Sequence, residues 1–175
     1  MKANYLPIQS VFDKHTVFEI PYYQRSYVWD EDNWSRFLED MENVSMTDKQ
    51  YFIGSLILKQ KPTETGSKYG NVRVVIDGQQ RLTTMTIFFK VLSLLKDNDR
   101  IFKTFMIDLS DETDEQEISI HHNHIDKTAF VHIVNLQSLD ELRAYLEKGK
   151  GTTQSRLFAS LPYAGISTRT LIRIN

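Results

Sequence analysis

Cysteine is absent from this sequence of 175 residues. Its absence excludes disulfide scaffolds, thiolate zinc sites, iron–sulfur clusters and cysteine nucleophiles. It is compatible with a reducing cytoplasm, which is the location we expect. Glycine and proline are also scarce, with 7 and 4 residues. Collagen-like, low-complexity and wholly disordered chains are therefore not indicated.

Long apolar runs are missing as well. The uncharged run from Leu82 to Phe89 lies between Arg81 and Lys90 and is far shorter than the roughly 20 residues of a transmembrane helix. The first 14 residues lack the apolar stretch of a secretory signal. The net charge of −2 excludes a strongly basic coat for nucleic acid but not a local phosphate site. We therefore expect no membrane partner.

The hydrophobic pattern predicts an α+β domain. Apolar, β-prone runs at 51–60 and 71–78 flank a polar turn, and so short a connection would make them antiparallel strands. A helix is expected after Asp30, and a second one over 80–96. The core face of this second helix is predicted to carry Leu82, Met85, Phe89 and Leu92, with Phe88 and Leu95 beside it.

The pattern is less regular in the second half of the chain. A third strand is expected within 100–109 and another within 118–125, and the acid-rich run at 108–117 reads as a solvated loop. Helices are predicted at 126–136 and after Ser138, which begins a capping box with Glu141.

The most informative motif is VVIDGQQRLTTM, in which an apolar strand leads through an Asp-Gly pair to a helix N-terminus. Such N-termini attract anions, and glycine allows a close approach. Amides, a guanidinium and hydroxyls nearby would add donors, and an aspartate there could bind Mg²⁺ or orient the arginine. A plain Asp-Gly turn with a capped helix and a solvated arginine explains the same pattern. The residues in question are Asp77, Gly78, Gln79, Gln80, Arg81, Thr83 and Thr84.

A second motif, IPYYQRSYVW, places four aromatic residues around Gln24 and Arg25. Interleaved aromatic and basic side chains could stack on bases and contact phosphates, or the rings could belong to the core while Arg25 pairs with a carboxylate. A third motif, IHHNHID, suggests a metal site, but no fourth ligand is placed by spacing and the contiguous residues do not match an HNH nuclease.

The segments IPYYQRSYVW, FIGSLIL and VVIDGQQRLTT, in this order and at this spacing, resemble the N-terminal domain of GmrSD-type restriction proteins. That family lies in the ParB/sulfiredoxin-like superfamily, so the resemblance implies a small mixed sheet packed with helices. It also implies a module that binds, and often hydrolyses, a nucleoside triphosphate in bacterial defence against phage DNA, particularly modified DNA. Sulfiredoxin chemistry is excluded because it needs a cysteine.

The resemblance implies a triphosphate site at the DGQQR motif, Asp77 to Arg81, faced by Gln24 and Arg25. Mg²⁺, held by Asp77, and the arginines would offset the charge on the transferred phosphoryl group. Asp77 and Arg81 are the expected catalytic residues. DNA and an HNH-type nuclease domain or subunit are the expected partners in the full system, and homo-oligomerisation is left open. The alternatives are a non-catalytic DNA-binding module and a domain that is itself a nuclease.

The resemblance covers about residues 5–150, so we expect a nucleotide-binding domain over 1–150. Residues 148–175 contain five basic residues and no acidic ones, although 23 acids precede them. We therefore expect 151–175 to be an atypical tail, as a truncation or frameshift would produce.

Overall fold

The computed structural model describes residues 4–13, 15–47, 50–62, 67–110, 113–122 and 126–148. The expected tail at 151–175 lies outside these residues. The described elements, in chain order, are α1 (Ile8–Val11), β1 (Thr16–Glu19), α2 (Glu31–Met46), β2 (Ile57–Lys61), β3 (Asn71–Asp77), α3 (Gln79–Lys96), the 3₁₀ turns η1 (Asp99–Ile101) and η2 (Lys103–Phe105), β4 (Met106–Ser110), β5 (Thr113–Ile118), β6 (Ile120–His121), α4 (Lys127–Val134) and α5 (Leu139–Lys148).

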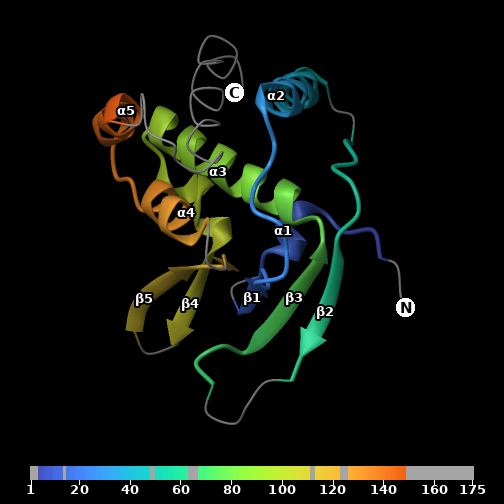
Figure 1. The fold of residues 1–175 in the computed structure, drawn as a ribbon. Coiled ribbons are helices and arrows are strands. Elements are labelled where there is room, and N and C mark those ends of the chain that lie inside the picture. Colours follow the sequence, from blue (N-terminus) through green and yellow to red (C-terminus); the bar gives the residue numbers. More distant parts are fainter. Residues whose placement is uncertain are drawn as a thin grey trace.

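The main sheet is mixed and has the strand order β2-β3-β1-β6. β2 and β3 are antiparallel, as their short connection predicts, whereas β1 is parallel to both β3 and β6. The β2–β3 register shifts between Ile57 and Leu58, at the end of the ladder where Ile57 faces Asp77. The sheet and the helices packed on it confirm the predicted α+β class (Figure 1).

Helix α3 lies at the centre of the molecule and is buried on nearly all sides (Figure 1). Its Phe88 packs edge-to-face on Phe37 of α2, and its Phe89 packs on Phe105 of η2. The predicted core face was right for Leu82, Met85 and Leu92 but wrong for the two phenylalanines, because Phe88 is buried and Phe89 is only partly so. Because the sheet and several helices surround α3, the threonines of this helix and its Lys90 are buried as well. Burial lowers the pKa of Lys90, whose ammonium lies over the ring of Phe102.

Two helix starts follow the predicted capping chemistry. The Asp30 side chain caps α2 by accepting a hydrogen bond from the Asn33 N–H, and the Asn33 side-chain oxygen accepts one from the Asp30 N–H. At α5, Ser138 Oγ accepts from the backbone N–H of Glu141. The Glu141 carboxylate accepts from the N–H of Gln137, one residue earlier than a standard capping box.

The expectation for the acid-rich run was wrong. Residues 113–118 form β5, which pairs antiparallel with β4. Ile118 packs against the core, and Ile107 opposite Glu117 is buried, so apolar residues at the strand ends anchor the hairpin. The preceding segment is strand only from Met106, because 99–105 forms the two 3₁₀ turns.

Candidate functional site

The turn between β3 and α3 has the geometry that the sequence predicts. β3 ends at Asp77 and α3 begins at Gln79, with Gly78 as the N-cap at φ +99° and ψ 6°. The left-handed backbone at Gly78 favours glycine, and an added Cβ would lie 2.3 Å from Leu56 Cδ2, so the leucine side chain would also have to move. Gly78 has no side chain with which to cap the first-turn N–H groups of α3.

Gln79 and Gln80 bind the chain rather than solvent. The Gln79 amide donates to the carbonyl of Arg25 at 3.0 Å. The Gln80 amide accepts from the N–H of Val28 at 2.9 Å and donates to the carbonyl of Ser26 at 3.3 Å. Both glutamines are buried. They fix the backbone of the 24–28 segment against α3, which is a use that the sequence did not reveal.

The same segment is held at two further points. The Gln24 amide donates to the carbonyl of Ile76 at 3.0 Å. The N–H of Tyr27 donates to the buried carboxylate of Asp126 at 2.7 Å. The structure thus brings the two Gln-Arg pairs of the sequence together. Sequence reasoning noted Asp126 only as part of the IHHNHID motif and the start of a predicted helix, and missed its bond to the Tyr27 backbone.

Arg81 extends to the other side of the N-terminus of α3. Two helical steps separate it from Gln79, which places the two side chains about 200° apart around the helix. Its Nη2 donates to the carbonyl of Ser55 and lies 3.3 Å from Asp77 Oδ2. The Arg81 side chain crosses over Gly54, and a Cβ added at Gly54 would lie 3.0 Å from Arg81 Nε. The Nε atom is buried and has no hydrogen-bond partner among the described residues.

Thr83 and Thr84 point into the interior. Thr83 Oγ1 lies 3.0 Å from His122 Nε2, and Thr84 Oγ1 lies 2.7 Å from the hydroxyl of Tyr27. Both threonines are fully buried, so in this conformation neither hydroxyl faces solvent. His122 packs on Phe130, and burial lowers the pKa of its imidazole to about 3.

Of the nine predicted nucleotide-binding residues, those open to solvent are Arg25, Asp77, Arg81 and, in part, Gln24. The Asp77 side chain is 61% exposed and that of Arg81 is 29% exposed. The aromatic motif divides in the same way: Tyr27 is buried in the core, whereas Tyr22 and Tyr23 are exposed. The core interpretation thus holds for Tyr27, and stacking of the exposed tyrosines on bases stays a prediction.

A pocket of about 200 Å³ lies beside Arg81. It is lined from α2, from the segment before β2 and from the end of the aromatic motif. Apart from Trp29 and Arg81, sequence reasoning singled out none of its residues for ligand binding, because they come from two separate stretches that only the fold brings to Arg81. The lining residues are Trp29, Asn33, Arg36, Phe37, Asp40, Tyr51, Ile53 and Arg81.

A resident multi-ligand metal centre is not found in the described part of the chain. No group of three or more histidine or acidic side chains that could hold an ion occurs there. Of the IHHNHID motif, His121 ends β6 and His122 is enclosed, while residues 123–125 lie outside the described residues. Among the predicted nucleotide-binding residues, Asp77 offers an exposed carboxylate, which suits Mg²⁺ if phosphate and water supply the other ligands.

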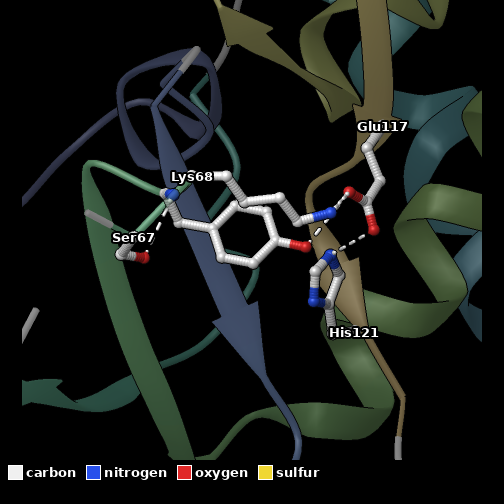
Figure 2. Close-up of polar contacts among 5 residues, drawn as sticks. Ser67, Lys68, Glu117 and His121 are labelled. Atoms are coloured by element: carbon white, nitrogen blue, oxygen red, sulfur yellow. Dashed lines mark hydrogen bonds and ion pairs between the residues drawn. The ribbon is translucent and has the colours of Figure 1, made fainter. Parts of the chain in front are cut away.

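A second polar cluster joins the loop before β3 to β5 and β6 (Figure 2). Glu117 accepts hydrogen bonds from Lys68 Nζ at 3.0 Å and from the Tyr69 hydroxyl at 3.1 Å, and its other oxygen lies 3.2 Å from His121 Nε2. Burial opposes ionisation, but Lys68, His121 and Tyr69 outweigh it and lower the pKa of the Glu117 carboxyl. The cluster fastens the β4–β5 hairpin to the main sheet.

Glu117→Gln should therefore lower the melting temperature at pH 7 by about 2–6 °C, because the amide binds these partners less strongly. A carboxyl with a lowered pKa stabilises the fold above its unfolded pKa and ceases to do so as the pH falls through the folded value. The difference between the two proteins should thus shrink below roughly pH 4. Asp140→Asn, in the exposed pair with Arg143, is the control and should change little. Equal melting temperatures of wild type and Glu117→Gln at pH 7 would contradict this assignment.

No membrane-spanning helix is found among the described residues. A comparison with family profiles matches residues 8–169 to the family described as GmrSD restriction endonuclease, N-terminal domain. The matched range passes the boundary expected near residue 150. A search of curated proteins found no match.

Proposed function

The chain belongs to the GmrSD restriction endonuclease N-terminal domain family, and from this premise we propose that it binds and hydrolyses a nucleoside triphosphate. Family membership makes it a module of a restriction system in which DNA and a nuclease are the further partners. We place the hydrolysis step upstream of DNA cleavage by a nuclease domain or subunit, in defence against modified phage DNA.

The observation that carries the proposal is the position of Arg81. Its guanidinium lies at the turn from β3 into α3, is partly exposed, and keeps a buried Nε without a partner among the described residues. Arginine binds phosphate oxygens through several N–H groups at once, and the first turn of α3 adds a positive dipole. These features together favour an anionic ligand at this turn.

Asp77 would act beside Arg81. Its Oδ2 holds the arginine at 3.3 Å, whereas Oδ1 has no hydrogen-bond partner in the described part of the chain. The free oxygen is available to accept a hydrogen bond from the attacking water or to bind Mg²⁺. Mg²⁺, when bound, supplies charge neutralisation on the phosphates. The amides of Gln79 and Gln80 are already engaged, so we assign them to holding the site together.

The chemistry rests on charge and positioning. In phosphoryl transfer, negative charge spreads over the oxygens of the transferred group, and fixed cations stabilise it. Arg81 is held in place by Ser55 and Asp77, so it would need little reorganisation to meet that charge. Arg25, whose side chain is exposed and whose backbone carbonyl accepts from Gln79 at the same helix N-terminus, would be the second cation.

Arg81→Ala should weaken the binding of Mg–nucleoside triphosphate by about 10- to 150-fold, because one charge-assisted contact is worth about 1.5–3 kcal/mol. Isothermal titration calorimetry with each triphosphate measures this. Arg81→Lys keeps the positive charge but loses the planar set of N–H donors of the guanidinium, so it should give an intermediate affinity. Arg143→Ala, on the exposed surface of α5, is the matched control.

Unchanged affinity in a folded Arg81→Ala protein would eliminate the site.

A specific observation supports one other function: Tyr22, Tyr23 and Arg25 are all exposed and lie close together in the sequence. Salt-sensitive DNA binding that needs no nucleotide and is lost on mutation of Arg25 but not of Arg81 would favour the DNA-binding module instead.

A further inference from the structure

The pocket beside Arg81 is built from elements that the triphosphate site does not otherwise use. Helix α2 contributes Arg36 and Asp40, the segment before β2 contributes Tyr51, and Trp29 precedes the α2 cap. Arg81 belongs to both the pocket wall and the β3–α3 turn. A ligand bound at that turn would therefore meet the pocket directly.

The side chains that line the pocket suit a flat ring. Three aromatic rings, those of Trp29, Phe37 and Tyr51, give it apolar walls, and the Trp29 and Phe37 rings lie 6.4 Å apart. Two guanidiniums, of Arg36 and Arg81, and one carboxylate, that of Asp40, also line it, and Arg81 is paired with Asp77 at the turn. Planar rings stack on aromatic and guanidinium groups, so this lining favours a flat ring next to the phosphate contacts expected at Arg81.

The pocket has room for only part of a nucleotide. Its volume of about 200 Å³ is below the roughly 300–1,000 Å³ typical of pockets that enclose a whole ligand. A base fits such a space, with the sugar and phosphates continuing toward the helix N-terminus.

Asp40 is oriented by its neighbour. The Tyr51 hydroxyl donates a hydrogen bond to Asp40 Oδ2. Burial, and then the bond to Asp40, raises the pKa of Tyr51 to about 12, so the hydroxyl stays a donor at neutral pH. A fixed carboxylate on the wall of a base pocket accepts hydrogen bonds and donates none.

We propose that this pocket receives the base of the nucleotide whose phosphates lie at Arg81, and that Asp40 reads the edge of that base. The inference rests on the proposed function and deepens it. Guanine presents two adjacent N–H donors on its pairing edge, which match a carboxylate. Adenine presents a donor next to an acceptor, which does not. The pocket therefore favours guanine over adenine.

The first test separates the base from the phosphates. We compare Mg–GTP with Mg–tripolyphosphate by titration calorimetry on the full chain. Tyr51→Ala should weaken GTP binding by about 5- to 150-fold, the range for loss of one base–aromatic stack. It should leave tripolyphosphate binding unchanged. Phe52→Ala is the control, since Phe52 is the exposed neighbour and does not line the pocket.

The second test concerns Asp40. Asp40→Asn keeps the size of the side chain and an oxygen for the Tyr51 hydroxyl, but places a donor on the pocket wall. The ratio of GTP affinity to ATP affinity should fall by about tenfold or more. An unchanged ratio would overturn the assignment of Asp40.

The outcomes distinguish this inference from the proposed function. If GTP and tripolyphosphate bind wild type equally well, or if Tyr51→Ala leaves GTP binding intact, the pocket does not hold the base, while the phosphate site stands. If Tyr51→Ala or Arg36→Ala weakens both ligands equally, the pocket holds phosphate and the inference is wrong. If wild type binds neither ligand, the proposed function fails and this inference fails with it.

Discussion

Wild type is expected to lose about 2–3 kcal/mol more stability between pH 7 and pH 4.5 than a variant in which glutamine replaces His122. His122 is enclosed between Thr83 and Phe130, and burial lowers the pKa of its imidazole to about 3, from 6.5 in the unfolded chain. Each pH unit between these values corresponds to 1.36 kcal/mol, and pH 4.5 lies about two units below the unfolded value.

The direction follows from proton binding. Below about pH 6.5 the unfolded chain takes up a proton at His122, whereas the folded chain does so only near pH 3. Acid therefore favours unfolding throughout that window, and the stability is fully present only above it. Glutamine keeps a hydrogen-bonding group near Thr83 and does not titrate, so the variant should show a flatter pH dependence.

Urea denaturation gives the free energy of unfolding of wild type and variant at pH 7 and at pH 4.5. The change between the two pH values is then compared between the two proteins, so any cost of the substitution that does not depend on pH cancels. His132→Gln, at an exposed position on α4, is the control and should keep the wild-type dependence. Parallel pH profiles for wild type and His122→Gln would show that the imidazole is not enclosed as described.

Gly78→Ala is expected to destabilise the fold by about 2–3 kcal/mol and to lower the melting temperature by roughly 5–10 °C. A side chain at φ +99° is strained whatever space surrounds it, and here the added Cβ would also lie 2.3 Å from Leu56 Cδ2 and 3.3 Å from the Ser55 carbonyl. Because Ser55 holds Arg81, nucleotide binding should weaken together with stability.

Gly70→Ala is the matched control for Gly78→Ala. Its Cβ would come no closer than 3.6 Å to any atom outside its chain neighbours, and its φ is ordinary. A change within about 0.5 kcal/mol is expected there. If Gly78→Ala melted like Gly70→Ala, the left-handed turn at the start of α3 would not be a fixed feature of the fold.

Local patterns were sufficient to predict much of this fold. The polar turn after residue 60 required antiparallel partners, and β2 and β3 form that pair. Asp30 and Ser138 are helix starts because their side chains meet backbone N–H groups within three residues. These relations span a few positions of the chain, so the sequence displays them directly.

What escaped prediction depends on distant partners. The acids of β5 resembled a loop because the strand is defined by its pairing with β4, not by its own composition. Gln79 and Gln80 resembled phosphate donors because the carbonyls that they bind lie more than 50 residues away. The strand, turn and helix around Asp77 were correctly predicted, and the roles assigned to Asp77 and Arg81 stay predictions.

The pocket could not be predicted for the same reason. Its walls come from Trp29, from one face of α2 and from Tyr51 and Ile53, and only the folded chain brings them to Arg81. Arg36 and Asp40 lie four positions apart on a helix that the sequence describes simply as amphipathic.

The anchoring of residues 24–28 has a consequence for the order of folding. The bond from Tyr27 to Asp126 closes a loop of 99 residues, and that from Val28 to Gln80 closes one of 52. Large loops close at a high entropic cost, which is recovered only once both ends have a structured neighbour. We therefore expect the segment to dock late, after the β2–β3 hairpin and α3 have formed. The exchange of the Tyr27 and Val28 amide protons with deuterium accordingly reports whether the molecule has completed its assembly.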